Sequence, residues 1–259
     1  FAPAQPLGHR GQDRRWLGEQ ITRSLHWLSR QELEKQRHEI WQFIRRNGEA
    51  GILIQRLEVD HRLTPVTAFA VNVLEDVGPA NVVDWAKALG IESTLKPDLS
   101  LALGSYEVRP LELAGAYATF AAGGMYEESR IVTRIVGPDG KDVDLKPLPP
   151  PRRVLEPAEA FVITNMLESV VDRGTAQRAK SLGRRVAGKT GTSNEAKDTW
   201  FAGFSPEIAA VTWVGYDDAK PLGSGETGGG TALPAWIAVM DAAHKGKPRA
   251  EFARPPGVS

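Results

Sequence analysis

The chain has 259 residues, which is enough to bury the core of one large or two small domains. It carries 32 Lys and Arg residues against 32 Asp and Glu residues, so no net charge draws it to nucleic acid or to a membrane surface. The absence of cysteine excludes disulfides and thiolate metal sites, and the five histidines lack the spacing of a zinc site. No apolar run approaches the ~20 residues that a membrane-spanning helix needs.

The composition of the chain changes near residue 69. Residues 1–69 carry eleven Lys and Arg residues against eight Asp and Glu residues. Ser29 and Glu32 have the spacing of a helix capping box, and Asn47-Gly48 is a typical helix end. The apolar stretch 52–59 fits either a strand or a second helix. We therefore expect a helical, basic N-terminal segment over residues 1–69 and a separate domain over residues 70–259.

The second segment alternates between helical and strand patterns. Apolar spacing, Pro starts and Gly stops predict helices over 71–77, 81–89, 110–122, 156–172 and 233–244. Alternation on both sides of Pro138-Asp139-Gly140 predicts a hairpin of strands 130–136 and 141–145, followed by a Pro-rich linker. Three closely spaced strands, 185–189, 199–204 and 208–216, predict an antiparallel meander. The fold class is therefore α+β, a small antiparallel sheet packed with helices.

The strand that opens the meander runs into Lys189-Thr190-Gly191-Thr192. Segments before and after it, in the same order and spacing, resemble the C-terminal part of the transpeptidase domain of class A penicillin-binding proteins. The resemblance covers residues 70–259 and rests on the following segments: Ala70-Val71-Asn72, Leu99-Ser100-Leu101-Ala102-Leu103-Gly104-Ser105, Val171-Asp172-Arg173-Gly174-Thr175, Thr199-Trp200-Phe201-Ala202-Gly203 and Trp213-Val214-Gly215-Tyr216-Asp217.

This resemblance implies roles for the four residues of the motif. Lys189 would supply positive potential for a substrate carboxylate and a proton path to the leaving group. The hydroxyls of Thr190 and Thr192 would bind that carboxylate, and the Thr192 backbone N–H would form half of an oxyanion hole. Gly191 would let the substrate backbone lie close to the strand. Members of this family need no metal or organic cofactor, and they act on the extracytoplasmic side of the inner membrane.

The family's other two motifs have no counterpart at the places where they belong. Residues 61–68 stand where the family carries Ser-x-Asn, and the chain contains no Ser-x-Asn at all. The nucleophile motif Ser-x-x-Lys, which normally lies well upstream, is missing there. The resemblance therefore implies a truncated or chimeric relative, with an incomplete sheet whose edge is left exposed.

One Ser-x-x-Lys does occur, at Ser93 and Lys96. The chemistry needs the serine in the first turn of a helix, so that the lysine one turn later can act as its base. Pro97 follows at once and favours a loop instead. A makeshift serine hydrolase built on Ser93 and Lys96 thus remains an alternative that requires Ser93 to begin a helix.

The leading hypothesis for function is a relative of the peptidoglycan DD-transpeptidases that is weak or inactive because it lacks a recognisable nucleophile. Its ligands would be a peptidoglycan stem peptide or a β-lactam. The alternative is a non-enzymatic module that binds a protein partner, or a second copy, through residues 1–69. The basic residues Arg45, Arg46, Arg56 and Arg62 are more typical of a solvated helix face than of a nucleic-acid site.

Overall fold

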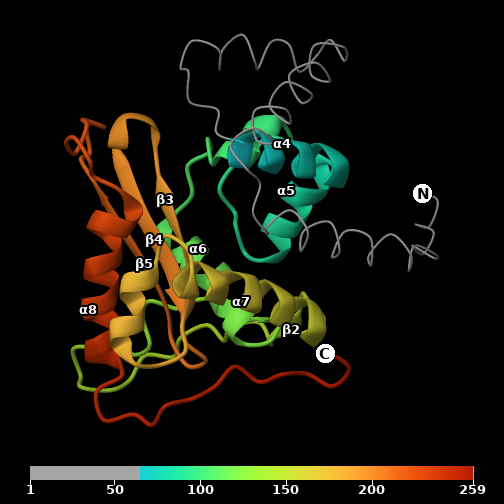
Figure 1. The fold of residues 1–259 in the computed structure, drawn as a ribbon. Coiled ribbons are helices and arrows are strands. Elements are labelled where there is room, and N and C mark those ends of the chain that lie inside the picture. The colour runs from blue at the N-terminus through green and yellow to red at the C-terminus, as the bar shows by residue number, and fades with distance from the viewer. Residues whose placement is uncertain (1–64, 259) are drawn as a thin grey trace. The chain divides into compact units, whose positions relative to one another are not determined.

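The computed structural model describes residues 65–258 (Figure 1). The helix, strand and basic cluster expected between residues 29 and 62 lie outside the described residues. The chain divides into two units, residues 1–73 and Leu74–Ser259, and the boundary falls inside helix α4 (Pro65–Val77). The description below concerns the second unit.

The helices of this unit agree with those predicted from the sequence. They are α5 (Pro79–Ala88), α6 (Pro110–Ala121), α7 (Pro157–Asp172) and α8 (Leu233–Ala243). Each has a proline at its first or second position, where the missing N–H costs no hydrogen bond. Glu156 and Glu159 form a capping box at the start of α7. The helix expected over 71–77 begins earlier, at Pro65.

Short helical turns connect these elements. They are η1 (Leu99–Leu103), η2 (Gln177–Leu182), η3 (Asn194–Ala196) and η4 (Gly228–Ala232). The first two have the tight 3-10 geometry, and η3 is a short turn in which Glu195 and Ala196 have positive φ angles. The fourth, η4, is a single π-helical turn that runs directly into α8. The glycine-rich loop before α8 therefore has regular structure at its end.

The predicted meander is present as an antiparallel sheet in the order β3 (Ala187–Thr192), β4 (Asp198–Phe204), β5 (Ala209–Gly215). Pairing is continuous from Ala187 opposite Phe204 to Thr192 opposite Thr199, and from Asp198 opposite Gly215 to Phe204 opposite Ala209. The first strand runs three residues beyond the predicted end at Lys189, so all four residues of the motif belong to it.

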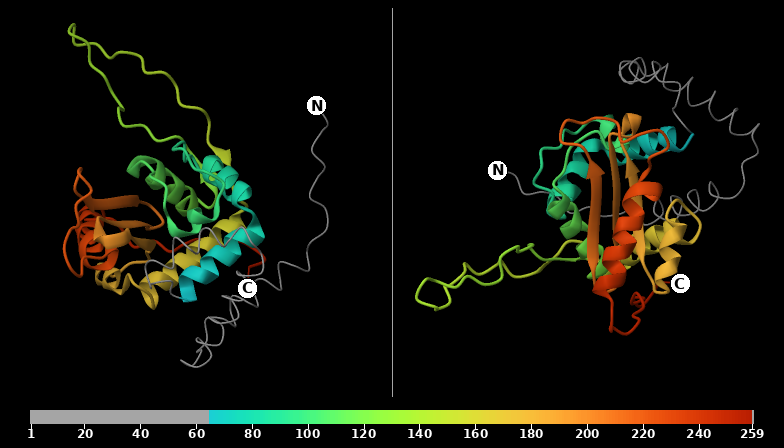
Figure 2. Two further views of the ribbon diagram at one scale, coloured as in Figure 1. Left: turned by 90° about the horizontal axis from the view of Figure 1, so that it is seen from above. Right: turned by 90° about the vertical axis from the view of Figure 1, so that its left-hand side faces the viewer.

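The hairpin expected between 130 and 145 is not formed as a pair of strands. Residues Val136 and Asp142 make one isolated bridge, and an ion pair joins Arg134 to Asp142. Figure 2 shows this stretch as an arm that projects from the helices and the sheet in both views. Because its aliphatic side chains are exposed, with Ile131 82% exposed, no packing holds a second strand against the first.

A second sheet, which the sequence did not predict, contains β1 (Met125–Tyr126) and β2 (Arg152–Arg153). Each strand has only two residues, too few for an alternating pattern to be recognised. Tyr126 also stacks beneath the guanidinium group of Arg152 at 4.6 Å. This ladder closes the base of the projecting arm.

The three-stranded sheet lies between helices on its two faces (Figure 1). On one face Phe201 packs edge-on against Trp236 of α8, with ring centroids 4.8 Å apart. On the other face Phe204 contacts Tyr117 and Phe120 of α6. Phe201, Phe204 and Trp236 are fully buried, so this core fixes the sheet and with it the strand that carries the motif.

Candidate functional site

The motif Lys189-Thr190-Gly191-Thr192 lies on β3, which is an edge strand among the residues described. Along an antiparallel strand, successive residues turn their backbone N–H and C=O groups alternately toward and away from the partner strand. The hydrogen bond from the Ser193 N–H to the Asp198 carbonyl shows which residues of β3 face β4. By that alternation the backbone groups of Lys189 and Gly191 turn toward β4. Those of Thr190 and Thr192 turn away from β4, toward the open edge. Among residues 65–258 no group accepts a hydrogen bond from the Thr192 N–H, and an oxyanion hole requires such a free donor.

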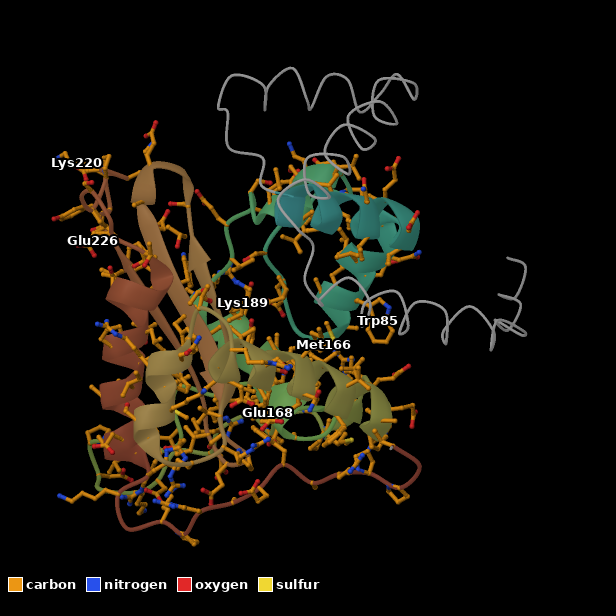
Figure 3. The ribbon with its side chains drawn as sticks, in the orientation of Figure 1. Trp85, Met166, Glu168, Lys189, Lys220 and Glu226 are labelled. Atoms are coloured by element: carbon orange, nitrogen blue, oxygen red, sulfur yellow. The ribbon has the colours of Figure 1, made fainter. Side chains whose placement is uncertain are left out.

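The ammonium group of Lys189 folds back onto the same edge. Its Nζ donates to the backbone carbonyl of Thr190 at 2.8 Å and lies 3.5 Å from the Thr190 hydroxyl. Loss of hydration lowers the pKa of Lys189 below its ordinary value of 10.5, although part of the side chain stays exposed. Figure 3 labels Lys189 on β3 and Glu168 on the neighbouring helix α7.

A residue that sequence reasoning did not single out completes this group of polar atoms. Thr175, just after α7, places its Oγ1 2.7 Å from the Oγ1 of Thr190. The helix end holds Thr175 in place, because the N–H groups of Gly174 and Ala176 both donate to the Val170 carbonyl. The resemblance included Thr175 in a matching segment, but only the fold brings it to β3, 15 residues along the chain from Thr190.

The turn η4 lies directly on the strand. The Gly228 N–H donates to Thr192 Oγ1 at 3.1 Å, which leaves the hydroxyl hydrogen of Thr192 free to be donated. A Cβ at Gly228 would lie 2.6 Å from the carbonyl oxygens of both Gly191 and Trp200. Only a glycine at position 228 lets the backbone of η4 come this close to the strand. The contact places η4 directly beside Thr192.

The arrangement therefore presents one cation, several hydroxyls and two outward N–H groups, those of Thr190 and Thr192, along a single strand edge. Such a set suits a carboxylate ligand whose backbone runs beside the strand. In residues 65–258, no group of three or more His, Asp and Glu side chains is placed to hold a metal ion. No helix in that range is long and apolar enough to cross a membrane.

Comparison with known families identifies the domain. Residues 66–234 match the penicillin binding protein transpeptidase domain, which is more than half of the chain. The chain belongs to the penicillin-binding protein transpeptidase family.

Several members of this family are similar to this chain in sequence. The chain is 42% identical over 208 residues to penicillin-binding protein 1A of Aquifex aeolicus, covering 80% of this chain and 28% of that protein. It is 37% identical over 210 residues to penicillin-binding protein 1A of Rickettsia conorii, covering 73% of this chain and 27% of that protein. The chain thus spans about a quarter of the length of these curated relatives.

Solved structures of the family share the fold. Penicillin-binding protein 1A from Haemophilus influenzae matches with a TM-score of 0.65 and 29% identity, over 73% of this chain and 34% of that chain. The penicillin-binding protein PonA1 from Mycobacterium tuberculosis matches with a TM-score of 0.61 and 28% identity, over 71% of this chain and 54% of that chain. The predicted α+β transpeptidase fold is therefore confirmed.

Ser93 and Lys96 do not form a helical pair. Ser93 lies in the loop between α5 and η1, and its hydroxyl donates to Glu112 Oε2 at 2.6 Å. Its N–H binds the same oxygen at 3.1 Å, and Arg109 donates to the other oxygen of Glu112. The hydrolase hypothesis required Ser93 to begin a helix, and the structure has no helix at this position. Instead, Ser93 is oriented by a carboxylate.

The contact between η4 and β3 leads to a prediction about stability. Gly228→Ala places a methyl group against two backbone oxygens that belong to the sheet, so it should reduce the free energy of unfolding by about 1–3 kcal/mol. Gly230→Ala, in the same turn, is the matched control, because its Cβ meets only the Thr227 hydroxyl, at 3.2 Å. Urea denaturation followed by circular dichroism measures both variants. Equal losses in the two would show that the turn does not rest on the strand as described.

Proposed function

We propose that this chain binds the C-terminal carboxylate of a D-Ala-D-Ala stem peptide, or that of a β-lactam, along the open edge of β3, and that it forms an acyl-enzyme weakly or not at all. The observation that carries the proposal is the arrangement of Lys189, Thr190 and Thr192 on that edge. Membership of the transpeptidase family supports the choice of ligand.

Binding would use groups that are already oriented. The Lys189 ammonium lies beside the Thr190 hydroxyl, and the Thr175 hydroxyl fixes the rotation of the Thr190 side chain. The hydroxyl of Thr192 accepts from Gly228, so its own hydrogen can point at the ligand. Pre-oriented donors bind an anion at lower entropic cost than free side chains do.

Acylation in this family uses a serine hydroxyl beside a base, and among the described residues no serine lies beside the Lys189 amine. No serine of residues 65–258 makes a hydrogen bond to the Lys189 ammonium, which bonds only to Thr190. Groups that stabilise charge assist a nucleophile but cannot replace it. Ser93 stays an untested alternative, and the Glu112 carboxylate that holds it is a weak base for a serine hydroxyl.

The compartment in which we expect the chain to act follows from where its proposed ligand is found. Stem peptides are found outside the cytoplasmic membrane, so we expect the chain to act on the extracytoplasmic side. A protein partner or a second copy that binds through residues 1–69 remains a prediction of the sequence, because residues 1–64 of that segment lie outside the described range.

The first prediction from this proposal concerns covalent chemistry. Incubation of the chain with a fluorescent penicillin, followed by a denaturing gel and intact-mass measurement, should give no adduct or only a trace. Circular dichroism of the same sample checks that the protein is folded. A stoichiometric adduct would overturn the proposed lack of acylation. Peptide mapping would then name the serine, and loss of the adduct in Ser93→Ala would support the hydrolase alternative.

The second prediction concerns the pH dependence of non-covalent binding. The protonated Lys189 ammonium attracts a carboxylate, and its pKa is lowered by burial, so affinity is present below that lowered pKa. Affinity should fall as the pH rises through it, before the ordinary value of 10.5 is reached. Calorimetric titration with diacetyl-Lys-D-Ala-D-Ala measures this. In Lys189→Arg the charge persists, so binding should no longer depend on pH in that range. The same pH profile in both would exclude Lys189 as the titrating group.

The third prediction concerns Thr175. Thr175→Val keeps the shape but removes the hydroxyl that orients Thr190, so stem-peptide affinity should fall roughly three- to tenfold. Thr175→Ser keeps a hydroxyl and should retain most of the affinity. Unfolding curves for both variants show whether the effect is local. If Thr175→Ser loses as much affinity as Thr175→Val, the methyl group rather than the hydroxyl is responsible.

A further inference from the structure

A buried carboxylate on α7 has no part in the ligand site described above. Only 7% of the Glu168 side chain is exposed, and buried glutamates are rare unless they are paired. Its partner is Arg185, whose Nη2 lies 2.5 Å from Glu168 Oε1. Arg185 stands two residues before Ala187, where β3 begins. The ion pair therefore joins the last half of α7 to the start of the strand that carries the motif.

The same guanidinium group also reaches the segment that follows α8. Arg185 Nε lies 3.6 Å from a carboxylate oxygen of Glu251. That segment is held on both sides of Glu251. Before it, Arg184 donates to two backbone carbonyls, and after it Phe252 packs edge-on against a buried ring of β4. Three segments that are far apart in the sequence thus meet at one guanidinium group, whose planar fork of donors can serve two carboxylates.

Stability does not explain this ion pair. Burial raises the pKa of Glu168 above its ordinary value of 4.5, and the opposite charge of Arg185 only partly offsets that increase. The neighbouring carboxylates of Asp172 and Glu251 add to it. Because the pKa is higher in the folded chain than in the unfolded chain, protonation of Glu168 favours folding. The ionised carboxylate present above that pKa therefore costs stability relative to the neutral acid.

What the ion pair does fix is how α7 lies along β3, on which it packs directly. The two elements meet a second time just past the helix end, where Thr175 Oγ1 lies 2.7 Å from Thr190 Oγ1. Helix α7 ends three residues before Thr175, and β3 is paired with β4 along its length. The turn after the helix is tight, because a Cβ at Gly174 would lie 2.9 Å from the Val170 carbonyl oxygen. A shift of α7 at Glu168 would therefore be carried to Thr175.

We infer that the ion pair of Glu168 and Arg185 positions the ligand site, because it aligns α7 with β3 and so keeps the Thr175 hydroxyl at the edge that binds a carboxylate. Neither residue is among the donors proposed for the ligand, so both act through Thr175. The effect on affinity rests on the proposed function, whereas the alignment is a property of the chain without ligand. A contact that costs stability when it is ionised thus contributes a fixed geometry.

Glu168→Gln in the full chain separates positioning from stability. The amide keeps the shape but loses the charge, so urea denaturation should give a free energy of unfolding that is unchanged or higher. The affinity for diacetyl-Lys-D-Ala-D-Ala, measured by calorimetric titration at neutral pH, should nevertheless fall roughly three- to tenfold. Asp172→Asn is the matched control, because it removes a carboxylate one turn further along α7 and leaves the ion pair intact. That variant should retain the affinity.

A second measurement needs no ligand. In the chain labelled at its threonine methyl groups, the NMR signals of Thr175 and Thr190 report the contact between them. As the pH falls through the raised pKa of Glu168, both signals should move, because protonation weakens the ion pair. In Glu168→Gln they should stay at the acid position throughout that range. The signal of Thr212 on β5, at the far side of the sheet from β3, is the internal reference and should not move.

A double variant tests whether the two residues act as one unit. Arg185→Gln alone leaves a buried carboxylate without its partner, so it should lower both the affinity and the free energy of unfolding. Adding Glu168→Gln removes that carboxylate and should restore the free energy of unfolding but not the affinity. If Arg185→Gln does not fold, Glu168→Gln and the double variant still decide.

Three results would overturn the inference. The first is unchanged affinity in Glu168→Gln when the unmodified chain binds the peptide. The second is methyl signals of Thr175 and Thr190 that do not follow the titration of Glu168. The third is a loss of affinity accompanied by an equal loss of unfolding free energy and by movement of the Thr212 signal, which would mean that the whole fold is loosened. If the unmodified chain binds no stem peptide, the proposed function fails, and the methyl signals alone decide whether the ion pair aligns α7 with β3.

Discussion

The register between β3 and β4 determines what the candidate site can present. Because Gly191 lies opposite Trp200 as a hydrogen-bonded pair, Thr190 and Thr192 have their backbone groups on the open side. A shift by one residue would turn these groups into the sheet and move every side chain to the other face. Phe201 and Phe204, packed on opposite faces against α8 and α6, hold the register in place.

Much of this arrangement could be predicted from the sequence, because its causes are local. Proline at a helix start and the tight turn after Phe204 are signals carried by neighbouring residues, so four helices and the meander were placed within a few residues. Only the first residue of the motif, Lys189, falls in the strand predicted over 185–189, and the structure extends that strand to Thr192. The functional reading of the motif depended on family resemblance, since Lys-Thr-Gly-Thr alone specifies no chemistry.

Contacts between distant segments were the part that could not be predicted. The approach of Thr175 to Thr190 depends on where α7 ends relative to β3, and no periodic pattern encodes that distance. Similarly, no local pattern in the sequence reveals that the missing side chain of Gly228 is what lets η4 touch the strand. The predicted hairpin at 130–145 is the opposite case, in which a local signal is present but the structure is not formed. Its local pattern is suitable, but no packed face supports it.

The two edges of the three-stranded sheet differ in a way that follows from their residues. At β3 a lysine and three threonine hydroxyls surround the outward backbone groups. A small anion can therefore accept hydrogen bonds from several separate donors along this edge. At β5 the side chains offer neither charge nor an oriented hydroxyl. A ligand at β3 would therefore be selected by charge.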